Sequence, residues 1–232
     1  MPDRPLIIAI DGPAGAGKST ISRLLAQHLR LDYLDTGAMY RAVAWALATM
    51  KDPPSKGRNL KTFLQDLDIT IEGSGPTQKV WVLGQEIGQK IRSPEITQLA
   101  STVSMRPEVR EALTEKQRAW GRKQGLVAEG RDMGSVVFPQ ADFKFFLTAS
   151  IEIRAQRRLV ELLQSGSAVS LDQVKKDMER RDAQDQKRAL APLQPAAEAR
   201  IIDTGPLTVD AILQILLTTI CGKVQPPFPR QE

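Results

Sequence analysis

Short apolar runs alternate along this chain with longer segments in which apolar side chains recur at helical spacing. The short runs have the length and apolar content of strands buried on both faces of a parallel sheet: 5–10, 33–34, 125–129, 143–148 and 201–202. Helical spacing predicts helices between and after them: 19–29, 38–50 and 209–220. Strands that alternate with helices predict an α/β fold with a parallel sheet flanked by helices.

One stretch departs from this alternation. Residues 68–72 alternate polar and apolar side chains, and after a glycine-rich turn a second extended run follows at 79–83. Another turn leads to Glu86-Ile87. The pattern therefore predicts a small antiparallel sheet, inserted into the α/β frame at about residues 60–100.

Composition and charge narrow the class of protein. The chain has 232 residues, of which 41% are hydrophobic and 25% charged, as in a soluble globular protein rather than a disordered, collagen-like or membrane protein. The formal charge of +5 favours anionic partners. The single cysteine, Cys221, agrees with a reducing cytoplasm, where we expect the protein to work, and we expect this thiol to be buried. Residues 223–232 contain three prolines, so we expect a single domain over 1–222 followed by a flexible tail.

The clearest motif is a phosphate-binding loop. The segment Gly12-Pro-Ala-Gly-Ala-Gly17-Lys18-Ser19 fits G-x-x-x-x-G-K-[ST] and lies between the first predicted strand and the first predicted helix. In such a loop backbone N–H groups bind phosphates, the lysine reaches the β- and γ-phosphates, and the hydroxyl, here Ser19, ligates Mg²⁺. The residues expected around the nucleotide are Gly12, Pro13, Ala14, Gly15, Ala16, Gly17, Lys18, Ser19 and Thr20.

Two further strand ends each carry an arginine and an acid. The segment Asp35-Thr-Gly-Ala-Met-Tyr-Arg41 follows the second predicted strand, and Gly130-Arg131-Asp132 follows the third. The carboxyl ends of parallel strands face one crevice, so these side chains should lie near the phosphate loop. The alternative is that they form ion pairs at the strand ends and bind nothing.

The densest charge pattern runs from Arg180 to Arg188. Read as a helix, it places four charged residues on one face: Asp177, Arg181, Asp185 and Arg188. An acid between arginines suits a phosphorylated ligand that also has hydroxyl groups, and the alternative is a solvent-exposed face braced by ion pairs. A second arginine cluster follows the fourth predicted strand: Arg154, Arg157 and Arg158. Gly166 is a candidate hinge between the two, so we expect residues 150–190 to form an arginine-rich lid.

Acid–base residues are scarce. The only histidine is His28, which we expect on the surface of the first helix. A phosphate monoester has a second pKa of about 6, so its oxygen is already anionic at neutral pH and needs no general base. The pattern therefore favours in-line phosphoryl transfer between two phosphates, promoted by Mg²⁺ and by positive side chains.

Four segments together match the motifs of one family. They are Ile8-Ala-Ile-Asp-Gly-Pro-Ala-Gly-Ala-Gly-Lys-Ser19, Asp35-Thr-Gly-Ala-Met-Tyr-Arg41, Glu129-Gly-Arg-Asp-Met-Gly-Ser-Val-Val-Phe-Pro139, and Arg180-Arg-Asp with Asp185 and Arg188-Ala-Leu-Ala-Pro-Leu193. Over about residues 6–220 the chain thereby resembles the bacterial cytidylate kinases, which are nucleoside monophosphate kinases. The resemblance implies transfer of the γ-phosphoryl of ATP to CMP or dCMP, with Mg²⁺, on a P-loop kinase core with a monophosphate-binding insert and a lid.

The resemblance also implies roles for individual residues. Arg41, Arg131 and Arg188 would hold the phosphate of CMP, while Arg181 and Asp185 would bind the ribose hydroxyls. Thr36, Ser101, Arg110 and Asp132 would line the cytosine, whose amino group suits the Asp132 carboxylate and whose acceptors suit Arg110. The expected catalytic cations are Lys18, Arg131, Arg158 and Arg188.

Two other functions stay open from the residues themselves. One is a phosphate-loop kinase for a different nucleotide or for a shikimate-like alcohol. The other is an ATP-gated protein that binds a polynucleotide, which is disfavoured because charges along 180–188 alternate in sign. No N-K-x-D tetrapeptide occurs in the chain, which weakens a GTPase interpretation. We expect a monomer without nucleic-acid or membrane partners.

Overall fold

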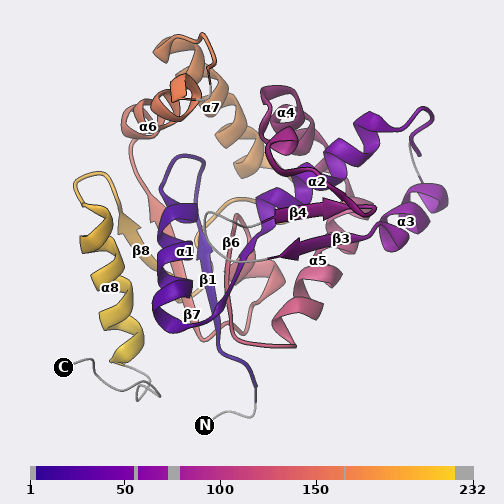
Figure 1. The fold of residues 1–232 in the computed structure, drawn as a ribbon. Helices are drawn as coiled ribbons and strands as arrows, with labels where there is room; N and C mark the ends of the chain where they lie inside the picture. Colours follow the sequence, from indigo (N-terminus) through magenta and orange to yellow (C-terminus); the bar gives the residue numbers. More distant parts are fainter. Residues whose placement is uncertain (1–3, 55–56, 73–78, 165, 223–232) are drawn as a thin grey trace.

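A five-stranded parallel sheet forms the centre of the computed structural model, which describes residues 4–54, 57–72, 79–164 and 166–222 (Figure 1). The expected tail at 223–232 lies outside the described residues. The strand order is β2-β6-β1-β7-β8, with bounds β1 (Ile7–Asp11), β2 (Asp32–Asp35), β6 (Leu126–Gly130), β7 (Phe143–Thr148) and β8 (Arg200–Asp203). All five predicted strands are confirmed, and the strand that leads into the phosphate loop lies in the middle of the sheet.

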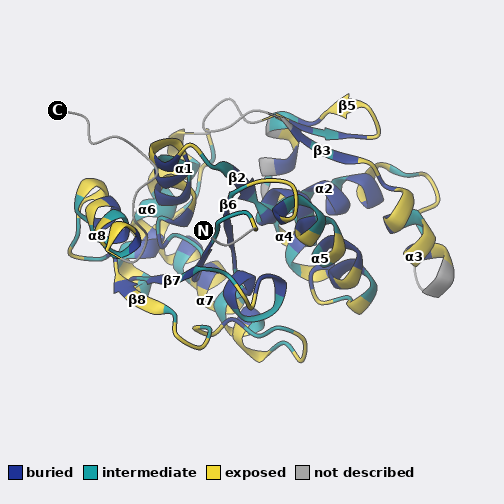
Figure 2. Cartoon of the chain, turned by 90° about the horizontal axis from the view of Figure 1, so that it is seen from below, coloured by how far each residue is buried: buried dark blue, intermediate teal, exposed yellow. Residues whose placement is uncertain are grey.

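Different helices cover the two faces of this sheet (Figures 1 and 2). The helices α1 (Lys18–Leu29) and α8 (Val209–Cys221) share one core with it, and α2 (Thr36–Thr49) and α5 (Pro107–Gly121) share the other. Along β1, Ile8 and Ile10 belong to the first core and Ala9 to the second, and all three are fully buried. Burial on both faces explains why β1 is apolar throughout rather than alternating.

The predicted insert is confirmed as a three-stranded antiparallel sheet. Its elements and neighbours are α3 (Gly57–Asp66), β3 (Ile69–Glu72), β4 (Lys79–Val82), β5 (Gln85–Glu86), the 3-10 helix η2 (Gly88–Arg92) and α4 (Pro94–Val103). Ile71 lies opposite Val80, and both side chains are buried in the same core as α2. Helices α3, α4 and α5 were not predicted from the sequence. In α5 many charged residues lie among the apolar ones, which obscures the helical spacing.

The expected lid is a pair of helices, α6 (Ile151–Gln164) and α7 (Leu171–Lys187), which follow β7 and stand above the sheet in Figure 1. They pack around a small core of their own, made by Ala155, Val174 and Met178. Gly166, the candidate hinge, lies between them with φ +82°, a conformation that favours glycine.

The expected stripe of four charges along α7 is correct for three residues and wrong for Arg188. Helix α7 ends at Lys187, and Arg188 has an extended backbone beyond it. Asp177 pairs with Arg180 at 3.3 Å on the exposed side of the helix. Asp177, Arg181 and Asp185 therefore keep the predicted spacing on one helical face, at its exposed end in the case of Asp177, and only Arg188 departs from it.

The expectation that Cys221 is buried is wrong, because this thiol is exposed. The buried side chains at this end of α8 are Leu216 and Ile220, four residues apart on one face. The next residue lies about 100° further round the helix and points away from the core. Among the described helices, none has the length and apolar character that a membrane span requires.

A buried carboxylate positions the turn after β6. Asp11, the last residue of β1, accepts hydrogen bonds from the backbone N–H groups of Met133 and Gly134, both at 2.8 Å. These residues begin a short π-helical turn, η3 (Met133–Val137). Arg131 and Asp132 directly precede this turn, so the end of β1 anchors the segment that carries both.

We predict that Asp11→Asn changes how stability depends on pH. Burial raises the pKa of the Asp11 carboxyl from its ordinary 3.8 to about 6, although the two N–H groups oppose the shift. The folded protein holds this proton more tightly, so the contribution to stability is full below about pH 4 and declines toward pH ~6, by about 3 kcal/mol. The free energy of unfolding of the variant relative to that of the wild type, measured with urea, should therefore rise by about this amount from about pH 4 to about pH 7. A stability difference that is the same at both pH values would contradict this.

Candidate active site

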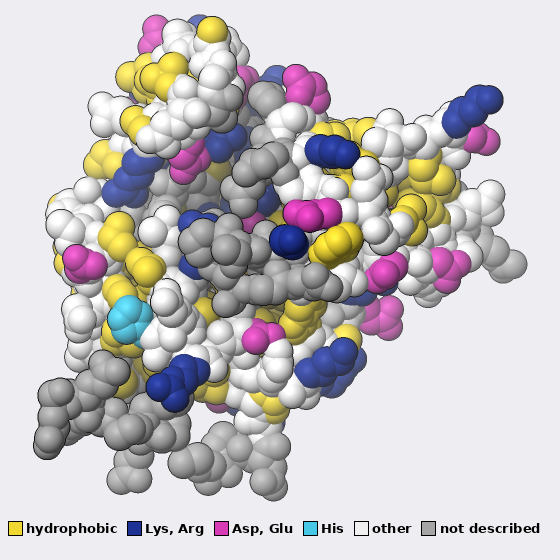
Figure 3. All heavy atoms as spheres, in the orientation of Figure 1, with side chains coloured by type: hydrophobic (Ala, Val, Ile, Leu, Met, Phe, Trp, Pro, Cys, Tyr) yellow, Lys and Arg dark blue, Asp and Glu magenta, His cyan; other side chains and the backbone are white. Residues whose placement is uncertain are grey.

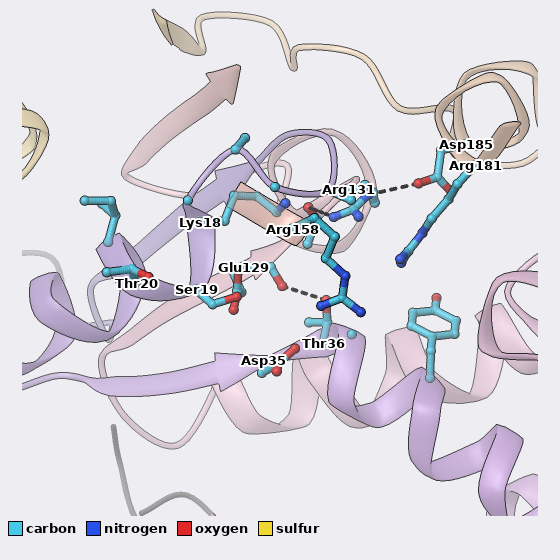
Figure 4. Close-up of a pocket in the computed structure, with 18 of the residues that line it drawn as sticks. Lys18, Ser19, Thr20, Asp35, Thr36, Glu129, Arg131, Arg158, Arg181 and Asp185 are labelled. Carbon is cyan, nitrogen blue, oxygen red and sulfur yellow. Dashed lines mark hydrogen bonds and ion pairs between the residues drawn. The ribbon is translucent and has the colours of Figure 1, made fainter. Parts of the chain in front are cut away.

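A cleft of about 570 Å³ opens along the carboxyl ends of the parallel strands, beneath the lid (Figure 4). Its walls come from the segments after β1, β2 and β6, from α4 and from both lid helices. In the space-filling view, Lys and Arg side chains gather in the hollow below the lid (Figure 3). Topology alone places the ligand site at this edge of an open parallel sheet.

The phosphate loop has the geometry that its sequence predicts. Residues 14–20 line the cleft, whereas Gly12 and Pro13 are buried and are not among the residues that line it. Gly12 has φ +146°, and a side chain there would run into the backbone carbonyl of Leu147 in β7, so only glycine fits. The Ser19 and Thr20 side chains are exposed at the start of α1.

Lys18 is buried and strongly perturbed. Its ammonium donates to the carbonyl oxygen of Pro13 at 2.7 Å. Burial, and then the charge of Arg131, lower the pKa of Lys18 to about 7. A bound polyanion in this loop would compensate the charge, so the site is arranged for phosphate groups.

Two carboxylates face the same part of the cleft. Glu129, at the end of β6, is buried and accepts a short hydrogen bond from the Tyr33 hydroxyl. Burial, and then the charge of Asp35, raise the pKa of Glu129. In Figure 4 both carboxylates lie beside Ser19. Sequence reasoning assigned Glu129 no role, although its place at a strand end before Gly130 could have indicated one.

The side of the cleft that is expected to hold the acceptor carries alternating charges from separate elements. Arg131 Nε donates to Asp185 at 3.0 Å. Arg188 lies between the two acids, 3.7 Å from Asp185 and 3.9 Å from Asp132. Although burial opposes it, the guanidinium groups of Arg131, Arg181 and Arg188 hold the pKa of Asp185 below its ordinary value. Desolvation, and then Arg131, lower the pKa of Arg181 to about 10.

Arg188 reaches this network because α7 ends before it. Its Nε donates to the carbonyl of Ala191 at 2.6 Å, so the chain beyond the helix folds back and turns the guanidinium inward. The main-chain carbonyl of Asp185, in the last turn of α7, also accepts a hydrogen bond from the backbone N–H of Leu193. The structure thus brings Arg188 to the predicted site by a route other than the predicted helical stripe.

The corner expected to read the base is built around Asp132. This buried carboxylate forms a short ion pair with Arg110, which also donates to the carbonyl of Ser104 at 3.2 Å. Arg110 therefore lies behind Asp132 and, among the described residues, does not line the cleft, in contrast to the expectation that it faces the base. Tyr40 does line the cleft, with Arg110 5.8 Å from its ring centroid, and sequence reasoning missed it.

Two hydroxyls predicted at the same corner are present in the cleft wall. The Thr36 hydroxyl donates to the carbonyl of Glu129 at 2.6 Å, and the Ser101 hydroxyl donates to Gln184 of α7 at 3.1 Å. Arg41 lies nearby and pairs with Asp35 at 3.1 Å, which directs its guanidinium along the cleft.

The three arginines of the first lid helix each make different contacts. Arg158 points into the cleft in Figure 4 and pairs with Glu161 at 2.9 Å. Arg157 donates to the hydroxyl and the carbonyl of Thr204, at 3.0 and 2.8 Å. Arg154 is buried and pairs with Asp182 at 2.6 Å. His28 is on the surface, as expected, and visible in Figure 3 far from the hollow.

A phosphate loop on the central strand, faced by clustered arginines beneath a helical lid, defines a phosphate-loop kinase. A family model described as cytidylate kinase matches residues 8–221. The chain therefore belongs to the cytidylate kinase family.

Individual relatives agree with this assignment. The chain is 44% identical to a cytidylate kinase of Syntrophotalea carbinolica over 99% of its own length and 98% of the relative's. It is 43% identical to a cytidylate kinase of Desulfitobacterium hafniense over 98% and 97% of the two chains. Among solved structures, an uncharacterized protein from Eubacterium ventriosum has a TM-score of 0.54 at 12% identity, covering 94% and 99% of the two chains, which shows a shared fold.

We predict that Lys18→Met stabilises the ligand-free protein while it removes activity. Burial disfavours the charged ammonium, so the gain should be full below about pH 7, where Lys18 is protonated, and should shrink as the pH rises above 7. At about pH 6.5 the thermal midpoint should rise by at least about 2 °C, the shift that about 1 kcal/mol produces in a chain of this size. Turnover should fall at least about 100-fold.

The matched control is Lys61→Met, because the Lys61 side chain is 55% exposed on α3 and lies outside the cleft. This control should change neither the midpoint nor turnover. A Lys18→Met protein that is less stable than the wild type at both about pH 6.5 and about pH 9 would refute the account of Lys18 given above.

Proposed function

We propose that this enzyme transfers the γ-phosphoryl group of ATP to CMP or dCMP, giving ADP and CDP or dCDP. The observation that carries the proposal is the alternating network of Asp132, Arg188, Asp185 and Arg131, which faces the phosphate loop across a single cleft. The two curated relatives described above are named cytidylate kinases, and both match the chain almost from end to end.

On the donor side, residues 12–20 bind the phosphates of ATP, and Lys18 lies between the β- and γ-phosphates. The donor set fits Mg²⁺: the exposed Ser19 hydroxyl lies on the same side of the cleft as Asp35 and Glu129. Burial, and then the charge of Asp35, raise the pKa of Glu129, and a bound cation would favour its charged form. The described residues contain no cluster of three or more His, Cys, Asp or Glu that could hold a metal ion. Phosphate oxygens and water would therefore supply most ligands, as is usual for Mg²⁺. When bound, the ion neutralises developing charge on the phosphates.

On the acceptor side, Arg41, Arg131 and Arg188 bind the phosphate of CMP, and Arg181 and Asp185 bind the ribose hydroxyls. Asp132 accepts a hydrogen bond from the cytosine amino group, and Thr36 and Ser101 contribute hydroxyls to the same corner. Arg110 holds the Asp132 carboxylate from behind, and it reaches the base only if it shares its donors between Asp132 and the ring.

The chemistry needs charge and alignment rather than proton transfer. An oxygen of the CMP phosphate forms the new bond to the γ-phosphorus, the bond from that phosphorus to the bridging oxygen breaks, and ADP leaves with the electron pair. Because the attacking oxygen is already anionic, no base removes a proton. Lys18, Arg131, Arg158 and Arg188 neutralise the charge that two polyanions bring together.

We also propose how the chain is organised around this reaction. Residues 1–222 form one catalytic domain, in which the insert at about 60–100 helps to enclose the monophosphate and the lid at about 150–190 closes over ATP. The enzyme works as a monomer. It works in the cytoplasm, where its nucleotides are found.

A panel of acceptors tests the substrate. We predict that ADP release with Mg²⁺-ATP is faster with CMP and dCMP than with UMP, AMP, GMP or shikimate. Cytosine presents an amino group to Asp132 from a single six-membered ring, whereas uracil has a carbonyl at that position and the purines are larger. The control is Lys18→Met, which should be inactive with every acceptor. Equal or faster turnover of AMP, GMP or shikimate would overturn the proposed function.

A second prediction concerns discrimination between cytosine and uracil. Asp132→Asn should lower the ratio of kcat/KM for CMP over UMP by at least about tenfold, or about 1.4 kcal/mol, because the amide also donates to the uracil carbonyl. The control is Glu161→Gln, which removes another carboxylate of the cleft wall on the lid and should leave the ratio unchanged. An unchanged ratio in Asp132→Asn would show that this carboxylate does not read the base.

A further inference from the structure

One buried guanidinium joins the phosphate loop to the lid. Arg154, in the first turn of α6, donates through Nη1 both to the carbonyl oxygen of Ala14, at 3.2 Å, and to Asp182 of α7, at 2.6 Å. Its Nε donates to the carbonyl of Ala149 after β7, at 2.9 Å. The side chains of Arg154 and Asp182 are 8% and 13% exposed, so the pair is little screened by solvent.

The phosphate loop packs closely against the lid helices around Arg154. A Cβ placed on Gly15 would lie 2.9 Å from the Arg154 carbonyl oxygen and 3.1 Å from the Met178 methyl group of α7. Ala14 packs against the small core of the lid. The backbone of the phosphate loop is therefore in direct contact with both lid helices, and a shift of the loop displaces them.

Asp182 transmits such a shift to the acceptor side. It lies next to Arg181 and three residues before Asp185 on α7, and these two carry the ribose side of the proposed acceptor site. Among the described residues, Asp182 Oδ1 is buried without a hydrogen-bond partner, so Arg154 is the contact that holds this carboxylate. Arg154 therefore adds a polar link from the phosphate loop to this part of α7, beside the apolar core that the two lid helices share.

We propose that Arg154 and Asp182 are positioning residues that couple filling of the phosphate loop to the placement of Arg181 and Asp185, so that the two nucleotides bind with positive cooperativity. This inference rests on the proposed function. The first ligand orders the loop, the guanidinium and α7 together, and the second ligand binds elements that are already ordered. Thermodynamic linkage requires that each nucleotide increase the binding affinity of the other by the same factor.

A second ion pair joins the same two helices and serves as the matched control. Lys175 of α7 pairs with Glu152 of α6 at 2.7 Å, but the two side chains are 36% and 59% exposed, far more than Arg154 and Asp182, and neither lines the cleft. Glu152→Gln therefore removes an α6–α7 contact without touching the loop. If bracing of the lid were the whole role of Arg154, the two pairs would behave alike.

The test measures the Kd of CMP by calorimetry, alone and with a saturating non-hydrolysable ATP analogue and Mg²⁺. In the wild type the analogue should tighten CMP binding between about 5-fold and about 150-fold, the usual range of coupling between sites. Asp182→Asn and Arg154→Lys should bring this factor to within about twofold of one. Glu152→Gln should keep the wild-type factor, and Asp182→Glu, which restores the charge, should recover part of it.

Each result decides between distinct conclusions. A wild-type factor within about twofold of one, or variants Asp182→Asn and Arg154→Lys that keep the wild-type factor, would overturn the coupling while both nucleotides still bind. Failure of the wild type to bind either nucleotide would instead overturn the proposed function. If circular dichroism shows that Asp182→Asn is unfolded, Arg154→Lys decides, because it keeps the positive charge beside Asp182. A purely structural role would lower the thermal midpoint and leave the ratio of the two Kd values unchanged.

Discussion

The constraint on which this structure depends is the crowding of positive charge at one buried edge of a sheet. Burial and neighbouring guanidinium groups lower the pKa of Lys18 to about 7 and that of Arg181 to about 10. The fold tolerates this because carboxylates are placed between the cations, as Asp185 is between Arg131 and Arg188. The cations and carboxylates of this cleft form ion pairs with one another, and phosphorylated ligands would replace some of these contacts.

The topology of the sheet sets where these charges meet. Segments that are far apart in sequence follow neighbouring strands, so the phosphate loop after β1, Arg131 after β6 and the lid after β7 converge on one cleft. Asp11 helps to fix this arrangement, since its carboxylate accepts two backbone hydrogen bonds from the turn after β6. The phosphate loop, the charged network around Arg131 and the lid are therefore parts of one packed unit rather than independent surfaces.

Local sequence was a good guide wherever the chemistry is local. The phosphate loop needs a buried strand, glycines with unusual backbone angles and a lysine at the start of a helix, and all of these lie within a dozen consecutive residues. Periodicity was a weaker guide in the lid. It extended the helical face to Arg188, whereas the helix ends at Lys187, and it did not show that Asp177 on that face is exposed to solvent.

The sequence by itself determined the parallel sheet, the phosphate loop, the inserted antiparallel sheet and the strand ends that carry the charged motifs. Only the tertiary structure decided which charges face a ligand and which face one another. Arg154 and Arg158 lie four residues apart in one cluster, yet one is buried against Ala14 and Asp182 and the other points into the cleft. The strength of an ion pair depends on the distance between its charges and on their burial. Both are set by several elements of the folded chain and cannot be read from the sequence.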